Sequence, residues 1–291
     1  MSSSEIETIL DAAASFKKSK APKDLAGRFL AFLFSEPSTR TRTSFEVAAR
    51  NLSAEVLGFS TASSSLLKGE SLLDTIKNLE AMGVEYFVVR NEVSGVLEPL
   101  AGQTSASLIN AGDGAHEHPT QALLDIFTLR EKKGAIKGLK VVIVGDIAHS
   151  RVARSNIHGL TKLGAKVTVC GPRALVPSGI EKLGASVSHD LDNALQGADA
   201  VNVLRLQLER QEQNLVTSLP DYYQSFGLTP ERLAKVPDCV VLHPGPMNRG
   251  VEISSEVADG PQSAILEQVA NGVLVRMAVL SLIQQWRTHG R

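Results

Sequence analysis

Short apolar segments that alternate with helical segments constrain the fold of this chain more than any other feature. The segment Lys140–Val144 reads Lys-Val-Val-Ile-Val, without polar alternation, which is typical of a strand buried on both faces. Similar segments occur seven more times, at Leu30–Phe34, Ala54–Gly58, Tyr86–Arg90, Ser107–Asn110, Lys166–Cys170, Ala200–Leu204 and Cys239–Leu242. Strands that alternate with helices predict an α/β fold, doubly wound, in which each parallel sheet is flanked by helices.

The predicted helices divide these strands into two series. They cover Ile6–Lys17, Ser38–Asn51, Ser71–Met82, Pro119–Lys132, Ser150–Leu163, Gly179–Leu183, Leu191–Gln196 and Gln262–Trp286. A chain of 291 residues is too long for one ordinary core, so we expect two domains. We place residues 1–134 together with 264–291 in one domain and residues 135–263 in the other, with a hinge near residues 134–138.

The balance of charge argues against a nucleic-acid partner. Thirty basic residues face 31 acidic ones, and aromatic residues make up 4% of the chain. The chain therefore has neither an overall positive field for a phosphate backbone nor many rings for stacking on bases.

Neither the cysteines nor the chain start suggests a metal site or a membrane segment. Cys170 and Cys239 are far apart, outside any metal-binding spacing, so we expect two free thiols. The first residues lack the basic and apolar stretches of a signal peptide, and the apolar run at 29–34 is too short to cross a bilayer. We expect a soluble, cytoplasmic protein with no membrane association, no metal and no cofactor.

The segment Ser38-Thr39-Arg40-Thr41-Arg42 follows a predicted strand and begins a predicted helix. A helix N-terminus offers unpaired N–H groups and a partial positive charge, and hydroxyl and guanidinium groups add further donors. This combination suits a phosphate. A capping serine followed by surface arginines fits the same pattern. Arg42, two residues beyond Arg40 on a helix, is expected to point away from it.

Two further segments begin with His-Pro. His118-Pro119-Thr120-Gln121 opens a periodic helix with proline at its first position, so His118 is expected at the helix mouth, where it can donate to a carbonyl or cap the helix. His243-Pro244-Gly245-Pro246 follows a strand, and its prolines remove N–H groups. The carbonyl oxygens that remain can accept hydrogen bonds from an amide or amine, although a rigid turn would look the same.

Other basic and amide side chains follow strands and suit a carboxylate. Arg205 and Gln207 are two residues apart in an extended segment and therefore share one face. Arg151 follows another strand. Lys68 lies beside Gly69 after a serine-rich stretch, where it could close over an anion or belong to a solvated linker. No Gly-x-Gly-x-x-Gly follows Lys140–Val144, and we found no phosphate-loop lysine motif and no Gly-x-Ser-x-Gly elbow.

Taken together, these segments resemble the aspartate/ornithine carbamoyltransferase family over nearly the whole chain, from about Leu30 onward. The Ser38–Arg42 segment, His118-Pro119-Thr120-Gln121 and His243-Pro244-Gly245-Pro246 occur in the order of that family. Within it the sequence is similar to the aspartate-specific members. Thr120 stands where ornithine enzymes usually have cysteine, and the Lys68-Gly69-Glu70 and Arg205-Leu206-Gln207 segments resemble those of the aspartate enzymes.

The resemblance implies roles for individual residues. The first domain would bind carbamoyl phosphate, and the second domain would add Pro244 and Gly245. The residues of the first domain would be Ser38, Thr39, Arg40, Thr41, Arg90, His118 and Gln121, with Ser64 and Lys68 supplied by the adjacent subunit of a homotrimer. The second domain would bind aspartate, through Arg151, Arg205 and Gln207, again with Lys68 of the adjacent subunit. Arg40, Thr41, Arg90, His118 and Lys68 would be catalytic. Ser64 is chosen within Ser63–Ser65 by its distance from Lys68.

The implied reaction transfers the carbamoyl group of carbamoyl phosphate to the amine of L-aspartate, a step of pyrimidine biosynthesis. Some relatives work as bare trimers, and others work with a dihydroorotase or a regulatory chain. Two alternatives stay open at this point. One is a transferase for ornithine or a related amine, and the other is a non-catalytic scaffold homologue.

Overall fold

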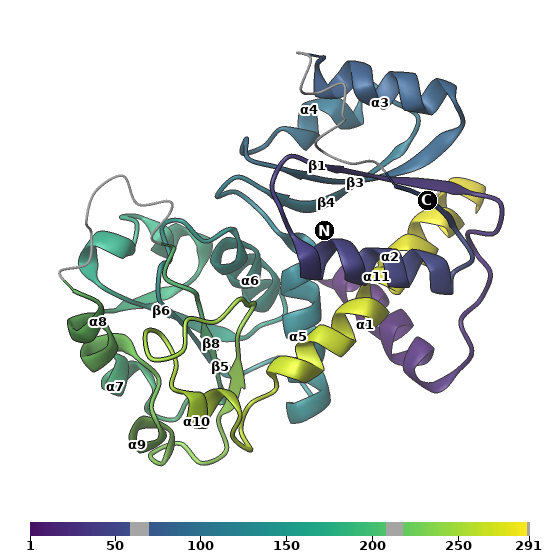
Figure 1. Ribbon diagram of the computed structural model, residues 1–291. Helices are drawn as coiled ribbons and strands as arrows, with labels where there is room; N and C mark the ends of the chain where they lie inside the picture. Colours follow the sequence, from purple (N-terminus) through teal and green to yellow (C-terminus); the bar gives the residue numbers. More distant parts are fainter. Residues whose placement is uncertain (59–69, 208–217, 290–291) are drawn as a thin grey trace. The chain divides into compact units, whose positions relative to one another are not determined.

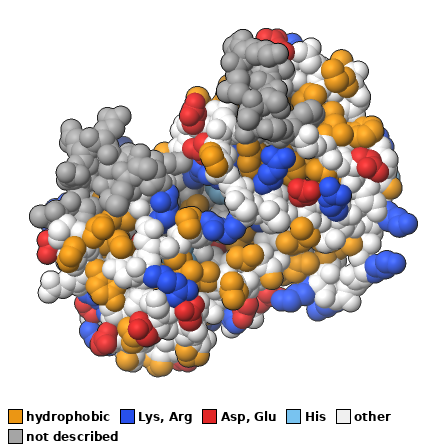
Figure 2. Space-filling view, viewed as in Figure 1, with side chains coloured by type: hydrophobic (Ala, Val, Ile, Leu, Met, Phe, Trp, Pro, Cys, Tyr) orange, Lys and Arg blue, Asp and Glu red, His pale blue; other side chains and the backbone are white. Residues whose placement is uncertain are grey.

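The computed structural model describes residues 1–58, 70–207 and 218–289. The chain forms two compact units, which consist mainly of residues 3–120 with 269–291 and of residues 121–268 (Figure 1). Each unit contains one parallel sheet, as the apolar segments predicted. The α/β class is confirmed. On the face seen in Figure 2, basic and acidic side chains are interspersed.

The sheet of the first unit has the strand order β2-β1-β3-β4. Its strands are β1 (Phe29–Phe34), β2 (Glu55–Leu57), β3 (Val84–Asn91) and β4 (Ser107–Asp113). The chain leaves β1 toward β2 on one side and returns to β3 on the other. The order therefore reverses between β1 and β3, which is where open α/β sheets usually bind ligands, at the carboxyl ends of the strands.

Alternate residues of β1 pack on the two faces of this sheet. Leu30 and Phe32 lie in a cluster with residues of α2 (Thr39–Asn51) and α11 (Ile265–His289). Ala31 and Leu33 lie in another cluster, with residues of α3 (Leu72–Ala81) and α4 (Leu97–Ala101). Figure 1 shows α3 and α4 on one face and α2 and α11 on the other, with α1 (Ser3–Lys18) on the same side as α11. Burial of both faces explains why the strand has no polar alternation.

Helix α11 is long and apolar enough to cross a membrane, judged by length and composition alone. The apolar run at 29–34 did not indicate this. Of its most apolar 18-residue window, 61% is buried inside the protein. Met277 and Leu280 of this helix pack against the residues of β1 and α2 in the core. The apolar character of α11 is therefore explained by its place in the core of the first unit.

The sheet of the second unit has the strand order β7-β6-β5-β8-β9. Its strands are β5 (Lys140–Val144), β6 (Lys166–Cys170), β7 (Ser186–Ser188), β8 (Ala200–Val203) and β9 (Val240–Leu242). Here the order reverses between β5 and β8. The helical elements are α5 (Pro119–Lys133), α6 (Arg151–Lys162), α7 (Leu191–Ala194), α8 (Leu219–Phe226), α9 (Pro230–Leu233), α10 (Ser255–Ala258) and the 3₁₀ turns η3 (Arg173–Leu175) and η4 (Ile180–Leu183).

Most differences from the predicted elements concern short segments. All eight predicted strands are present, with ends shifted by a few residues, whereas β7 was not predicted. It has three residues, none of them buried, so it carries no apolar signal. Four-residue helices such as α9 and α10 are too short to show a helical period, and Gly179–Leu183, predicted as a helix, contains the 3₁₀ turn η4.

Both cysteines are buried and free, as predicted. Burial raises the pKa of the Cys170 thiol and of the Cys239 thiol to about 12. Because the thiolate is the reactive form, both side chains serve as small apolar core residues at neutral pH.

Candidate active site

The carboxyl ends of β1 and β3, on either side of the reversal in the first unit, are tied together by polar contacts. The backbone N–H of Ser35 donates to the carbonyl oxygen of Arg90 at 3.0 Å. The guanidinium Nε of Arg90 lies 3.1 Å from Oε2 of Glu36, and both side chains are mostly buried. This ion pair holds the Arg90 side chain beside the end of β1. The Ser38–Thr41 segment continues from that end.

The Ser38–Thr41 segment forms the start of α2. Ser38 occupies the N-cap position, but its side chain makes no capping hydrogen bond. The capping interpretation is therefore correct for its position and wrong for its hydroxyl group. Thr39 and Arg40 are exposed, and Thr41 is buried. The first turn of α2 contains no acidic residue, so its N–H groups and positive end remain suited to an anion.

Arg42 has the structural position that its spacing predicted. Its guanidinium carbon lies 5.3 Å from the centre of the Phe32 ring, on β1. Such a contact favours packing against the sheet. Arg40 and Arg42, two residues apart in one helix, thus have different surroundings.

His118 is buried and directly precedes Pro119, the first residue of α5, as predicted. The loop that leads to it from β4 is organised by Asp113. The carboxylate of Asp113 accepts hydrogen bonds from the backbone N–H groups of Gly95 and Glu117 and from the side chain of Asn110, at 2.7–3.1 Å. Burial raises the pKa of Asp113, but these hydrogen bonds and that from His116 outweigh it, so the pKa is lowered overall. An ionised Asp113 therefore fixes the loop that carries His118.

The reversal between β5 and β8 gathers the candidate aspartate ligands of the second unit. Arg151 is buried at the first position of α6, and Arg205 and Gln207 follow β8. Nε2 of Gln207 donates to the carbonyl oxygen of His149 at 3.0 Å, which joins the two segments. The segment after β5 is itself fixed by Asp146, whose Oδ1 lies 2.8 Å from Nδ1 of His149. The hydrogen bond from Gln207 to His149 thus joins the two segments that carry Arg151 and Arg205.

The segment after β9 has an internal hydrogen-bond network. Nδ1 of His243 accepts from the backbone N–H of Gly245 at 2.8 Å, so the other ring nitrogen, Nε2, carries the proton in the neutral imidazole. Nε2 lies 3.2 Å from Oε1 of Glu252, which also accepts from the backbone N–H of Asn248. His243 is therefore a buried support for the carbonyl groups of Pro244 and Gly245 that follow it.

Gln121, near the start of α5, donates through Nε2 to Oδ1 of Asp125 at 2.8 Å. Asp125 is fully buried and accepts three further side-chain hydrogen bonds. No motif in the sequence marks Asp113, Asp125, Asp146 or Glu252. A contact between Gln121 and Asp125 could have been predicted, because residues four apart on a helix lie on the same face.

Ser64 and Lys68, predicted as ligands from an adjacent subunit, lie outside the described residues.

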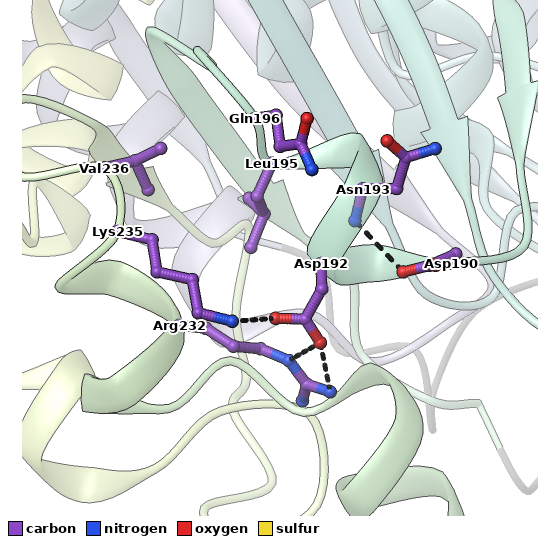
Figure 3. Close-up of a pocket in the computed structure, with 8 residues that line it drawn as sticks. All are labelled: Asp190, Asp192, Asn193, Leu195, Gln196, Arg232, Lys235 and Val236. Atoms are coloured by element: carbon purple, nitrogen blue, oxygen red, sulfur yellow. Dashed lines mark hydrogen bonds and ion pairs between the residues drawn. The ribbon is translucent and has the colours of Figure 1, made fainter.

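A pocket of about 410 Å³ beside α7 and α9 is lined by none of these residues (Figure 3). The two basic side chains that line the pocket already pair with an acidic one. Both Arg232 and Lys235 point at Asp192 and pair with it at 3.2 and 2.8 Å. Arg232 also donates to the carbonyl of Gly227, and Asp190 caps α7. These contacts hold the short helices together, so the polar residues that line the pocket have a structural role.

Comparison with known proteins also divides the chain into two parts. Residues 1–131 match the family model described as aspartate/ornithine carbamoyltransferase, carbamoyl-P binding domain, and residues 137–283 match that of the Asp/Orn binding domain. The aspartate carbamoyltransferase catalytic subunit of Desulforamulus reducens is 57% identical, over 98% of this chain and 93% of the relative. That of Halothermothrix orenii is 56% identical, over 96% and 91%.

Two solved structures have the same fold over 97% of the chain. Aspartate transcarbamoylase from Trypanosoma cruzi, in complex with N-(phosphonacetyl)-L-aspartic acid, has a TM-score of 0.87 at 29% identity, with 92% of that chain covered. Ornithine carbamoyltransferase from Pyrococcus furiosus has a TM-score of 0.85 at 33% identity, with 93% covered. With both family models matched and relatives above 50% identity along almost the whole length, the chain belongs to the aspartate/ornithine carbamoyltransferase family.

Proposed function

We propose that this chain is the catalytic chain of an aspartate carbamoyltransferase. It would transfer the carbamoyl group of carbamoyl phosphate to the amine of L-aspartate, giving N-carbamoyl-L-aspartate and phosphate for pyrimidine biosynthesis. The observation that carries the proposal is identity of 53–57% to aspartate carbamoyltransferase catalytic subunits, over 96–98% of the chain. The grouping of Arg151, Arg205 and Gln207 at one strand-order reversal supports a dicarboxylate as second substrate.

In the proposed site, the start of α2 binds the phosphate group. Ser38, Thr39, Arg40 and Thr41 would surround its oxygens with hydroxyl, guanidinium and backbone donors. Arg90 would contact both the phosphate and the carbonyl oxygen, and His118 and Thr41 would donate to that carbonyl.

The carbamoyl amino group needs acceptors, and Gln121 together with the carbonyls of Pro244 and Gly245 would supply them. Arg151, Arg205 and Gln207 would bind the two carboxylates of aspartate. Ser64 and Lys68 of an adjacent subunit would complete both parts of the site.

The reaction requires no covalent enzyme intermediate. The amine lone pair attacks the carbamoyl carbon, a C–N bond forms, and negative charge develops on the carbonyl oxygen. The bond from carbon to the phosphate oxygen then breaks, and phosphate leaves with that electron pair while the amine loses a proton. Donors placed at the developing charge lower the barrier by about 3–4 kcal/mol each, and binding both substrates side by side supplies much of the rest.

The test is turnover of carbamoyl phosphate with either L-aspartate or L-ornithine. We expect carbamoyl transfer to aspartate alone. Ornithine is the second candidate, because an ornithine carbamoyltransferase is among the similar structures. Turnover of ornithine alone would overturn the proposal, and a folded protein that uses neither amine would favour the scaffold alternative.

We extend the proposal to assembly and location. The enzyme would be a homotrimer with shared active sites, and a dihydroorotase or regulatory chain would be a partner where one exists. It would work in the cytoplasm, which agrees with its two free, buried cysteines.

A further inference from the structure

Asp125 is surrounded by side-chain amides. Its side chain is 0% exposed. Oδ1 accepts hydrogen bonds from Nε2 of Gln121 at 2.8 Å and from Nε2 of Gln268 at 2.7 Å. Oδ2 accepts from Nδ2 of Asn156 at 2.8 Å and from Nδ2 of Asn202 at 3.1 Å. One carboxylate on α5 thus collects donors from α6, β8 and the start of α11.

An ionised carboxylate can only accept, so every amide that meets it must present its NH₂ group. This fixes the direction of amides that could otherwise turn over. Gln121 donates Nε2 to Asp125, and its Oε1 must face the other way. A carbamoyl amino group has two hydrogens to donate, so it needs an oxygen at this position.

The same carboxylate also directs the loop after β9. Gln268 donates Nε2 to Asp125, and its Oε1 accepts from the backbone N–H of His243 at 2.9 Å. A reversed Gln268 amide would place NH₂ against that buried N–H group. The orientation of Gln268 therefore anchors the segment that continues to Pro244 and Gly245.

We propose that Asp125 is a positioning residue that turns the Gln121 amide so that its oxygen, and not its nitrogen, faces the carbamoyl amino group. This inference rests on the proposed function. It concerns recognition of the amino group, while the phosphate and carbonyl contacts are left to other residues.

The side chains that contact Asp125 carry no charge, so the charge of Asp125 itself is what changes with pH in this cluster. All four contacting side chains are neutral amides. Same-face neighbours of Asp125 on α5, three or four residues away, are Gln121, Ala122, Thr128 and Leu129, and those of Asn156 on α6 are Val152, Ala153, Gly159 and Leu160. Those of Gln268 are Ala264, Ile265, Asn271 and Gly272, and those of Asn202 in the extended strand are Ala200 and Leu204. None of these side chains titrates. The titratable groups next along this network are His243, whose backbone N–H meets Gln268, and Glu252, which lies beside the His243 ring.

Two double variants move the carboxylate to opposite sides of the cluster while keeping the same number of carboxylates and amides. In D125N/N202D, the new NH₂ of residue 125 takes the place of Oδ2 and donates toward position 202, so Asn156, which also donated to Oδ2, must turn over. The oxygen of residue 125 still accepts from Gln121 and Gln268. In D125N/Q268E, the NH₂ donates toward position 268, whose other oxygen keeps the His243 N–H, and Gln121 must turn over. Both variants keep one buried carboxylate and three amides besides Gln121.

Acetyl phosphate is the probe, because it has a methyl group in place of the amino group and makes no demand on Gln121. The measurement is the ratio of KM for carbamoyl phosphate to Ki for acetyl phosphate, in the aspartate assay. We expect this ratio to stay within about threefold of wild type in D125N/N202D and to rise by about tenfold or more in D125N/Q268E, since two donors then face each other. Equal ratios in the two folded variants would overturn the inference.

The wild-type protein provides a second measurement if a variant does not fold. A protonated Asp125 loses one acceptor position. The same ratio should therefore rise as the pH is lowered through about 6, where Asp125 takes up its proton. Titrations that affect the phosphate or the carbonyl act on both ligands and cancel. A ratio that stays constant from about pH 8 to about pH 5 would overturn the inference. Absence of any aspartate turnover in the wild-type protein would instead refute the proposed function.

Discussion

Single residues of this protein divide into proposed ligand residues, some exposed and some buried, and buried acids that hold their segments in place. Arg40 is exposed at the start of α2, whereas Asp113, Asp125 and Asp146 are 0–1% exposed. Each of these acids accepts hydrogen bonds within or beside a segment that carries a proposed ligand residue. The effect of a substitution should therefore depend on which class it removes.

Replacing Arg40 by alanine should weaken carbamoyl phosphate binding and leave the fold intact. A charge-assisted hydrogen bond contributes about 1.5–3 kcal/mol, so we expect KM for carbamoyl phosphate to rise by about 10- to 100-fold. Arg50→Ala is the matched control, since Arg50 is exposed near the other end of α2 and pairs only with Glu46 among the contacts found in the described residues. Steady-state kinetics and thermal melting of both variants check this. An unchanged KM in Arg40→Ala would show that the phosphate does not bind there.

Asp125 should make stability depend on pH in a defined direction. Burial raises its pKa to about 6, against the opposing effect of hydrogen bonds from Asn156, Gln268, Gln121 and Asn202. The folded chain then holds a proton that the unfolded chain has lost, so the contribution of Asp125 to stability is present below about pH 4 and falls as the pH rises to about 6.

The comparison with Asp125→Asn isolates this effect. The free energy of unfolding of the wild type, minus that of the variant, should decrease by about 1–3 kcal/mol between about pH 4 and about pH 7. Urea unfolding at a series of pH values measures it. Two curves that run parallel across this range would contradict the expected pKa.

At the scale of elements, the site depends on how closely the strand ends approach each other. Gly145 directly follows β5 and has φ = 130°, a conformation that side chains rarely adopt. A Cβ atom there would lie 2.8 Å from the carbonyl oxygen of Leu204, just after β8. Glycine at this position lets the segments that carry Arg151 and Arg205 come together.

Gly145→Ala should therefore cost more stability than an alanine at another glycine with positive φ. Gly138 is the control, because its φ is 87° and a Cβ there meets nothing within 4 Å. We expect Gly138→Ala to cost about 1 kcal/mol and Gly145→Ala about 1–3 kcal/mol more, together with a higher KM for aspartate. Denaturant unfolding and aspartate titration measure these effects. Equal losses in the two variants would mean that the strand ends separate without penalty.

At the scale of the whole molecule, the described part of each unit contains one strand-order reversal, and part of each set of proposed ligands lies there. The first set suits a phosphate and a carbonyl oxygen, and the second suits carboxylates. If Lys68 reaches a neighbouring subunit, each site also needs a second copy of the chain. The native mass should then be about three times the 31.1 kDa of one chain.

Mixing two inactive variants tests shared sites directly. His118→Ala and Lys68→Ala trimers should each be nearly inactive. After dissociation and reassembly at equal amounts, about a quarter of the sites should combine an intact His118 with an intact Lys68 from a neighbour in a cyclic trimer. Activity should return to about that fraction of wild type. No recovery in mixed trimers of the expected mass would place both residues of a site in one chain.

The sequence by itself determined the fold class, the approximate limits of the longer elements and the segments that matter for function. Strands buried on both faces are continuously apolar, and Pro119 marks the start of α5, so these features are readable locally. The spacing within Ser38–Arg42 also separated Arg40 from Arg42, but it could not show that Arg42 packs on Phe32.

Only the tertiary structure decided the strand order and the partners of the buried polar groups. Asp125 meets Asn156, Asn202 and Gln268, which lie 31, 77 and 143 residues away in the chain. The contact of Arg42 with Phe32 and the approach of Gly145 to Leu204 likewise depend on which elements become neighbours. Local periodicity records how a residue is buried, whereas the choice of its hydrogen-bond partners depends on packing between distant segments, which no short stretch of sequence contains.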